Sequence, residues 1–124
     1  MTDAIQLSIR RVTADAAEFD VIELAGRLDS ATAHQVEKSI LRLTEAGSNV
    51  VVHCADLIFV ASSGMRAFIL GARSAKARGR VFRVAGLIPH VSEVFRVTGL
   101  FRILDIRPTL DDALDRPGAV ADGS

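Results

Sequence analysis

The sequence predicts an α/β domain in which about four helices cover a mainly parallel or mixed sheet of four to five strands. Segments with the alternation of strands follow segments with helical periodicity along the chain, which is typical of a helix-covered parallel sheet. Three consecutive β-branched residues, Val50, Val51 and Val52, indicate a central strand buried on both faces. A short polar link between the first two strands favours an antiparallel hairpin at the sheet edge.

The N-terminal hairpin is predicted from apolar residues at every second position. This alternation predicts strands over residues 5–12 and 19–26, with a polar turn between them. A helix follows, for which Asp29 or Ser30 is a suitable N-terminal cap and Gly47 a natural end. Its apolar residues form one stripe, which should face the sheet.

The second half of the chain repeats the order of helix and strand. Its element boundaries are predicted from glycines that follow helices and from a proline suited to a first helical turn. The expected elements are a helix that begins at Ser62 or Ser63 and ends before Gly79, a strand over 80–86, a helix that begins with Pro89 and ends before Gly99, a strand over 101–106, and a helix over 109–115 capped by Thr109.

Length and composition predict one domain over residues 1–117 and a flexible tail over 118–124. The formal net charge is zero, which argues against a protein built to bind nucleic acid. No apolar run is long enough for a membrane span. Cys54 is the only cysteine and the N-terminus does not resemble a signal peptide, so we expect a cytoplasmic protein.

Positive charge is concentrated in the middle of the chain, because no acidic residue occurs between Asp56 and Glu93. Such a run is compatible with a solvated basic face, and also with a surface that meets an acidic partner or an anion. The basic residues of this interval are Arg66, Arg73, Lys76, Arg78, Arg80 and Arg83.

Common catalytic and metal-binding patterns are missing from the sequence. His34, His53 and His90 fall in separate elements and have no ligand partner at suitable spacing, so no metal site is expected. No glycine-rich phosphate loop or nucleophile elbow occurs. We therefore expect neither a cofactor nor enzymatic activity.

Two adjacent serines, Ser62 and Ser63, stand at the expected start of the second helix in the stretch DLIFVASSGMR. One of them is expected to cap the helix, since a serine hydroxyl can bond a free amide of the first turn. The same free amides and the helix dipole would stabilise an anion, such as a phosphate on serine. Arg66, one turn into the helix, could pair with that phosphate.

The chain resembles the STAS domains of the anti-sigma factor antagonist family, and the resemblance covers almost its whole length. The segments that carry it are LAGRLDSATA (24–33), VVVHCADLIFVASSGMRAFI (50–69) and LIPHVSEVFRVTGLFRILDIRPTLDDAL (87–114). In the middle segment, family members have a strand that ends in Asp-Leu, a short apolar link, and Asp-Ser-Ser/Thr-Gly before a helix. Ser62, Ser63 and Gly64 match this pattern, whereas Ala61 replaces its aspartate.

The resemblance implies a STAS fold and a switch between protein partners. The unphosphorylated protein would bind an anti-sigma factor, a serine kinase of the histidine-kinase-like ATPase type, and so release a sigma factor. The kinase would phosphorylate Ser62, with Ser63 as the fallback, and a PP2C-like phosphatase would reverse this. The expected partner-binding residues are Asp29, Ser30, Ala61, Ser62, Ser63, Gly64, Met65 and Arg66.

Two alternatives remain open. Ala61 and the basic run are also compatible with a phosphorylation-independent STAS scaffold or a subunit of another signalling or transport complex. An enzyme acting on a small molecule would rest on the two serines alone.

Overall fold

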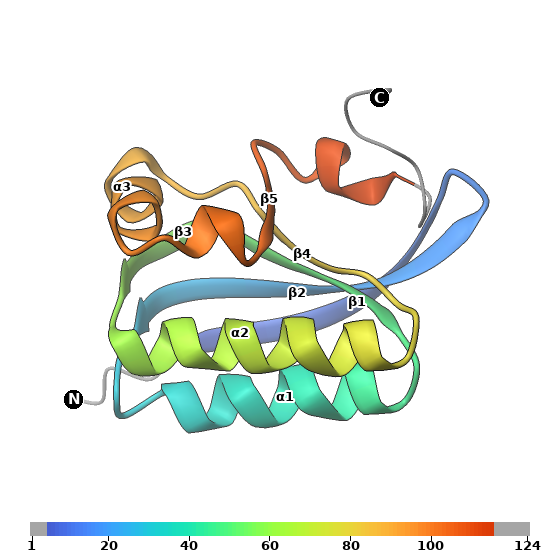
Figure 1. Ribbon diagram of the computed structural model, residues 1–124, viewed down its shortest axis with the longest axis horizontal. Coiled ribbons are helices and arrows are strands. Elements are labelled where there is room, and N and C mark those ends of the chain that lie inside the picture. Colours follow the sequence, from blue (N-terminus) through green and yellow to red (C-terminus); the bar gives the residue numbers. More distant parts are fainter. Residues whose placement is uncertain (1–4, 116–124) are drawn as a thin grey trace.

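The computed structural model describes residues 5–115, and a five-stranded sheet forms its centre (Figure 1). The spatial order of the strands equals their order in the sequence. The first strand is antiparallel to the second, and the other neighbouring strands are parallel, so the mainly parallel sheet with an edge hairpin is confirmed. The strands are β1 (Gln6–Ala14), β2 (Ala17–Leu28), β3 (Asn49–Val60), β4 (Phe82–Ala85) and β5 (Asp105–Arg107).

Two of the helices lie side by side along one face of the sheet (Figure 1). These are α1 (Ala33–Glu45) and α2 (Ser62–Ala77), and α3 (Pro89–Val97) follows β4. Short 3₁₀ turns, η1 (Leu100–Arg102) and η2 (Asp111–Leu114), flank β5. None of the helices within residues 5–115 has the length and hydropathy needed to cross a membrane.

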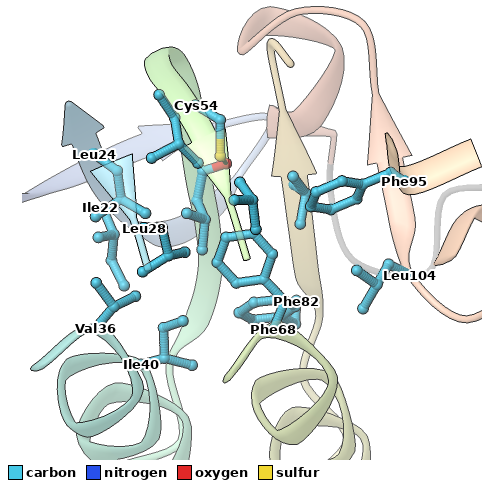
Figure 2. Close-up of a cluster of buried hydrophobic side chains, with 14 of the residues drawn as sticks. Ile22, Leu24, Leu28, Val36, Ile40, Cys54, Phe68, Phe82, Phe95 and Leu104 are labelled. Carbon is cyan, nitrogen blue, oxygen red and sulfur yellow. Dashed lines mark hydrogen bonds between the residues drawn. The ribbon is translucent and has the colours of Figure 1, made fainter. Parts of the chain in front are cut away.

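The main core lies between the sheet and its helices. Figure 2 shows side chains of α1 and α2 directed toward the strands, with an aromatic contact that joins three elements. The ring of Phe68 in α2 lies 6.4 Å from that of Phe82 in β4 and 5.9 Å from that of Phe95 in α3. A smaller cluster on the opposite face contains Phe19 and is covered by Ala113 of η2. Both faces of the central strands are therefore buried, as the run of valines predicted.

The expected cap of α1 is wrong by a few residues. The N-cap is Thr32, and the helix begins at Ala33. Asp29 instead accepts a hydrogen bond from the amide of Ala31 at 3.0 Å, and the Thr32 hydroxyl donates to the carbonyl of Arg27 at 2.9 Å. These bonds hold residues 29–32 in a turn, which delays the start of the helix.

The last expected helix is a 3₁₀ turn rather than an α-helix. Thr109 Oγ1 does accept a hydrogen bond from the amide of Asp112, at 3.1 Å. Arginine side chains, however, bind the carbonyl oxygens of Asp112, Ala113 and Asp115, which a longer helix would need for its own bonds. The predicted tail at 118–124 and the predicted domain end at 117 lie outside the described residues.

One member of the basic run is buried rather than exposed. Arg83 lies in β4 with 2% of its surface accessible, and it donates to Asp105 and to the carbonyls of Ala113 and Asp115. Burial lowers the pKa of its guanidinium, although the group stays charged beside these acceptors. Arg83 therefore holds the C-terminal segment against the sheet and cannot belong to a basic surface.

Candidate functional site

The candidate site lies at the end of the sheet where β3 ends and α2 begins. The parallel topology brings the carboxyl ends of β2 and β3 to this end, where both α1 and α2 start (Figure 1). The amide of Ala61 donates to the carbonyl of Leu28, the last residue of β2, at 2.8 Å. The two predicted segments, residues 29–30 and 61–66, are thereby placed next to each other.

The first turn of α2 has no side-chain cap, which contradicts the expectation that a serine caps the helix. The N-cap is Ala61, in an extended conformation, and its carbonyl accepts bonds from the amides of Gly64 and Met65. Ser62, the first helical residue, is exposed. The hydroxyl of Ser63 is buried and has no hydrogen-bond partner within the described part of the chain.

Gly64 allows close packing between the start of α2 and the sheet. A Cβ at this position would lie 2.5 Å from Cγ of Leu28 and 3.2 Å from Cγ1 of Val60. Only glycine therefore lets the first turn of α2 approach the ends of both central strands. Gly64 is buried, so its contribution to the site is to bring the turn close to the sheet.

Arg66 is an exposed cation in the first turn of α2, where no acidic residue occurs. It has no hydrogen bond or ion pair to any residue in the range 5–115. Side chains four residues apart are neighbours on a helix surface, so Arg66 lies on the same face as Ser62. A free guanidinium near the positive end of the helix dipole is slightly unfavourable, and an anion on Ser62 would compensate for it.

Met65 connects the first turn of α2 to the end of α3. Its sulfur lies 3.8 Å from the hydroxyl of Thr98, which also donates to the carbonyl of Val94 at 2.7 Å. The sequence prediction did not include this contact.

Three large apolar residues on the exposed side of the same region were missed as well; they are Val97, Phe101 and Ile103. The buried positions of this segment are already filled by Phe95, Leu100 and Leu104. The segment thus has more apolar residues than its core contacts need, and this excess could have indicated the exposed ones from the sequence.

The turn that contains Asp29 and Ser30 borders the start of α2. Ser30 is exposed, whereas the carboxylate of Asp29 is occupied by the amide of Ala31. Of the two, Ser30 is the more available to a partner.

Neither a metal centre nor an activated nucleophile is found among residues 5–115. No group of His, Cys, Asp and Glu in this range could hold a metal ion. His53 bonds Glu23 at 2.7 Å on the sheet face opposite to the side chain of Cys54. Burial raises the pKa of the Cys54 thiol, so the reactive thiolate is disfavoured.

The arrangement is suited to receiving a phosphate. Ser62 is exposed, the amides that precede Gly64 lie before the helical hydrogen-bond ladder begins, and Arg66 offers a guanidinium that has no counter-ion in the described part of the chain. No carboxylate side chain stands at the N-cap to repel an added phosphate, because that residue is Ala61.

The chain is similar to the STAS domain family and to two proteins described as anti-sigma factor antagonists. The family model of the STAS domain matches residues 11–113. A protein of Bordetella bronchiseptica, described as the putative anti-sigma factor antagonist BtrV, is 30% identical over 67% of this chain and 72% of its own length. The anti-sigma-B factor antagonist of Bacillus subtilis is 25% identical over 68% of this chain and 78% of its own.

Solved structures share the same fold. An anti-sigma factor antagonist from Mycobacterium paratuberculosis superposes with a TM-score of 0.80 at 23% identity, over 92% of this chain and 94% of that one. The Bacillus cell fate determinant SpoIIAA in its phosphorylated form gives a TM-score of 0.66 at 22% identity, over 88% and 96%. Together with the family model, these matches show that the chain belongs to the STAS domain family.

Proposed function

We propose that this chain is an anti-sigma factor antagonist, and that phosphorylation of Ser62 ends its binding to an anti-sigma factor. The observation that carries the proposal is the exposed Ser62 at the start of α2, one turn from Arg66, which is unpaired within residues 5–115. Both curated relatives are described as antagonists of this kind, which supports the functional class.

Ser62 is favoured over Ser63 as the acceptor because a kinase needs a hydroxyl that can reach the terminal phosphate of ATP. The Ser63 hydroxyl is buried, so it would become accessible only if the first turn of α2 opened. Ser63 remains the fallback position. Once formed, a phosphate on Ser62 would be stabilised by Arg66 and by the free amides of the first turn.

The switch requires no large conformational change. A phosphate adds about −1.5 to −2 charges at pH 7, and this charge would lie in a surface that loses water when the partner binds. Burying it without a counter-charge costs several kcal/mol. A loss of about 3 kcal/mol weakens binding more than a hundredfold. The proposed contact surface consists of the exposed parts of Asp29, Ser30, Ala61, Ser62, Ser63, Met65 and Arg66, with Gly64 beneath them.

The proposed partners act in the cytoplasm. The anti-sigma factor would be a serine kinase of the histidine-kinase-like ATPase type, and a PP2C-like phosphatase would restore the binding form. The chain itself would catalyse no reaction and would act by occupying the kinase surface that otherwise holds a sigma factor.

The proposal is tested by incubating the purified chain with each ATPase-type anti-sigma factor of its organism and ATP, followed by mass spectrometry of the intact protein and of its peptides. We expect one phosphate on Ser62. The variant Ser62→Ala should accept none, whereas Ser63→Ala should be phosphorylated normally. If no kinase phosphorylates the chain, or if Ser62→Ala is still modified at the helix start, the assignment of Ser62 is wrong.

A second function is favoured by one observation, the alanine at the N-cap of α2. If a kinase requires a carboxylate at this position, the chain would be a STAS scaffold that binds its partner without control by phosphorylation. The variant Ala61→Asp distinguishes the two: under the scaffold function only this variant is phosphorylated, whereas under the first proposal the unmodified chain is phosphorylated as well.

A further inference from the structure

Large apolar residues are concentrated on one exposed segment. Four such side chains are exposed within residues 5–115, and three of them belong to the end of α3, to η1 and to the residue that follows η1. We call Val97, Phe101 and Ile103 the α3–η1 patch; their exposed fractions are 66%, 45% and 57%. Buried neighbours already anchor this segment to the core, as Figure 2 shows for Phe95 and Leu104. The outward side chains are therefore not needed to hold the segment in place.

One end of the patch, at Val97, adjoins the turn that carries Ser62. Figure 1 shows α3 at the end of the sheet where α2 begins. Thr98, which directly follows Val97, contacts the sulfur of Met65 at 3.8 Å. Met65 is three residues from Ser62 and so lies on the same side of α2. A partner that covers Ser62 would meet the α3–η1 patch next.

A hollow adjoins the patch at Phe101. It has a volume of about 360 Å³, and Phe101 forms one of its walls with Leu87, Pro89 and Ile106. An apolar hollow of this size can accept one protruding side chain, which is the usual anchor of a protein–protein interface. A flat lipid surface would leave it unfilled.

The charges around the patch select an acidic partner. Arg102, inside η1, and Arg66, in the first turn of α2, are both exposed and have no ionic partner in the described range. Arg96, in contrast, is paired with Glu93, so its charge is balanced within α3. Two free guanidinium groups therefore flank exposed apolar side chains and are available to carboxylates of a partner.

We propose that the α3–η1 patch and Arg102 form the second half of the surface that binds the anti-sigma factor. The anti-sigma factor would place an apolar side chain into the hollow beside Phe101 and carboxylates against Arg102 and Arg66. This inference rests on the proposed function, and it extends the contact surface beyond the residues near Ser62. Phosphorylation would act on one half of the surface, and the α3–η1 patch would supply affinity in the other.

The test measures the affinity of the full chain for the purified anti-sigma factor that phosphorylates Ser62 in the experiment described above. The variants are Phe101→Ser, Ile103→Ser and Arg102→Glu. Lys38→Glu is the matched charge control, because Lys38 is an exposed cation of α1 without an ionic partner in residues 5–115. Thermal unfolding of each variant monitors the fold. Ile103 is more exposed than Phe101, and Arg102 also lies at the surface, so their variants keep the test valid if Phe101→Ser unfolds.

We expect Phe101→Ser to raise Kd at least about thirtyfold, as for an interface hot spot. Ile103→Ser and Arg102→Glu should each raise it about tenfold, and the effect of Arg102→Glu should shrink at high salt. Lys38→Glu should leave Kd within about twofold, as expected of a charge outside the interface.

Three results would overturn the inference. If the unmodified chain binds the kinase and the three variants bind equally well, the patch lies outside the interface, and the proposed function stands. If these variants lose binding to vesicles of phosphatidylglycerol and phosphatidylcholine but not to the kinase, the patch is a membrane surface. Failure of the unmodified chain to bind any anti-sigma factor would instead reject the proposed function together with this extension of it.

Discussion

Replacing Arg83 by methionine is expected to destabilise the protein strongly, because this buried arginine joins β4 to the C-terminal segment. Its guanidinium donates to Asp105 at 3.2 Å, to the carbonyl of Ala113 at 3.0 Å and to the carbonyl of Asp115 at 2.7 Å. Methionine has a similar stem but no donors, so the two carbonyls would lose their partner, whereas Asp105 would keep its bonds from Arg107. A buried carbonyl left without its donor costs about 1–3 kcal/mol, so the loss of both bonds should cost about 2–6 kcal/mol.

The expected loss can be measured by thermal unfolding. For a domain of this size, about 1 kcal/mol corresponds to roughly 4 °C, so Arg83→Met should lower Tm by roughly 8–24 °C. Arg80→Met is the matched control: Arg80 is exposed and donates to a single carbonyl, that of Gly47. This control should cost less than about 1 kcal/mol. If both variants unfold within a few degrees of each other, the structural role assigned to Arg83 is refuted.

Three further predictions concern the core and the phosphate site. Gly71→Ala should lower the free energy of unfolding by about 1–3 kcal/mol, because the new Cβ would lie 2.8 Å from the ring of Phe82. An increase in stability would show that α2 can move away from β4 at little cost. Cys54 should react with a thiol reagent only on unfolding. Burial raises the pKa of this thiol in the folded state. The contribution of the thiol to the free energy of unfolding should therefore be constant below pH 9.0, the ordinary thiol pKa, and should decrease above it. The variant Cys54→Ala should lack that decrease; equal pH slopes would contradict the burial argument. Arg66→Gln should destabilise the phosphorylated chain by about 1 kcal/mol more than the unmodified one, as judged by paired denaturant titrations; equal effects would exclude a pair between Arg66 and the phosphate on Ser62.

The sequence predicted the order and direction of the strands because those features follow from local patterns. The run of Val50, Val51 and Val52 indicated a strand covered on both faces, and all three are fully buried. The short link after β1 indicated the hairpin, which β1 and β2 form without a break in register. Periodicity alone contains this information, since a strand or helix must present its apolar residues to a core.

The features that the sequence did not predict depend on contacts between distant residues. The delayed start of α1 depends on the bond from Thr32 to the carbonyl of Arg27, and the short η2 depends on arginines of β4 and β5. The run of basic residues does not indicate that Arg83 is buried, because the groups that accept its hydrogen bonds lie more than twenty residues later in the sequence. Similarly, only the packing of α3 and η1 distinguishes exposed apolar residues such as Phe101 from their buried neighbours.

At the candidate site, the sequence placed the start of α2 correctly but assigned its serines the wrong structural role. Ala61 occupies the cap, so neither hydroxyl is used there. The close approach of Gly64 to Leu28 directs Ser63 inward and leaves Ser62 at the surface. The two serines therefore differ in exposure, and this difference predicts that Ser62 rather than Ser63 accepts the phosphate.

The most direct test of the central claim is the affinity of one anti-sigma factor kinase for the same chain before and after phosphorylation. With the unmodified and the enzymatically phosphorylated proteins measured side by side, we predict that phosphate on Ser62 raises Kd at least about a hundredfold. Dephosphorylation should restore the original affinity. Equal affinities of the two forms would contradict the account, because the exposed hydroxyl of Ser62 would then lie outside the surface that the partner covers.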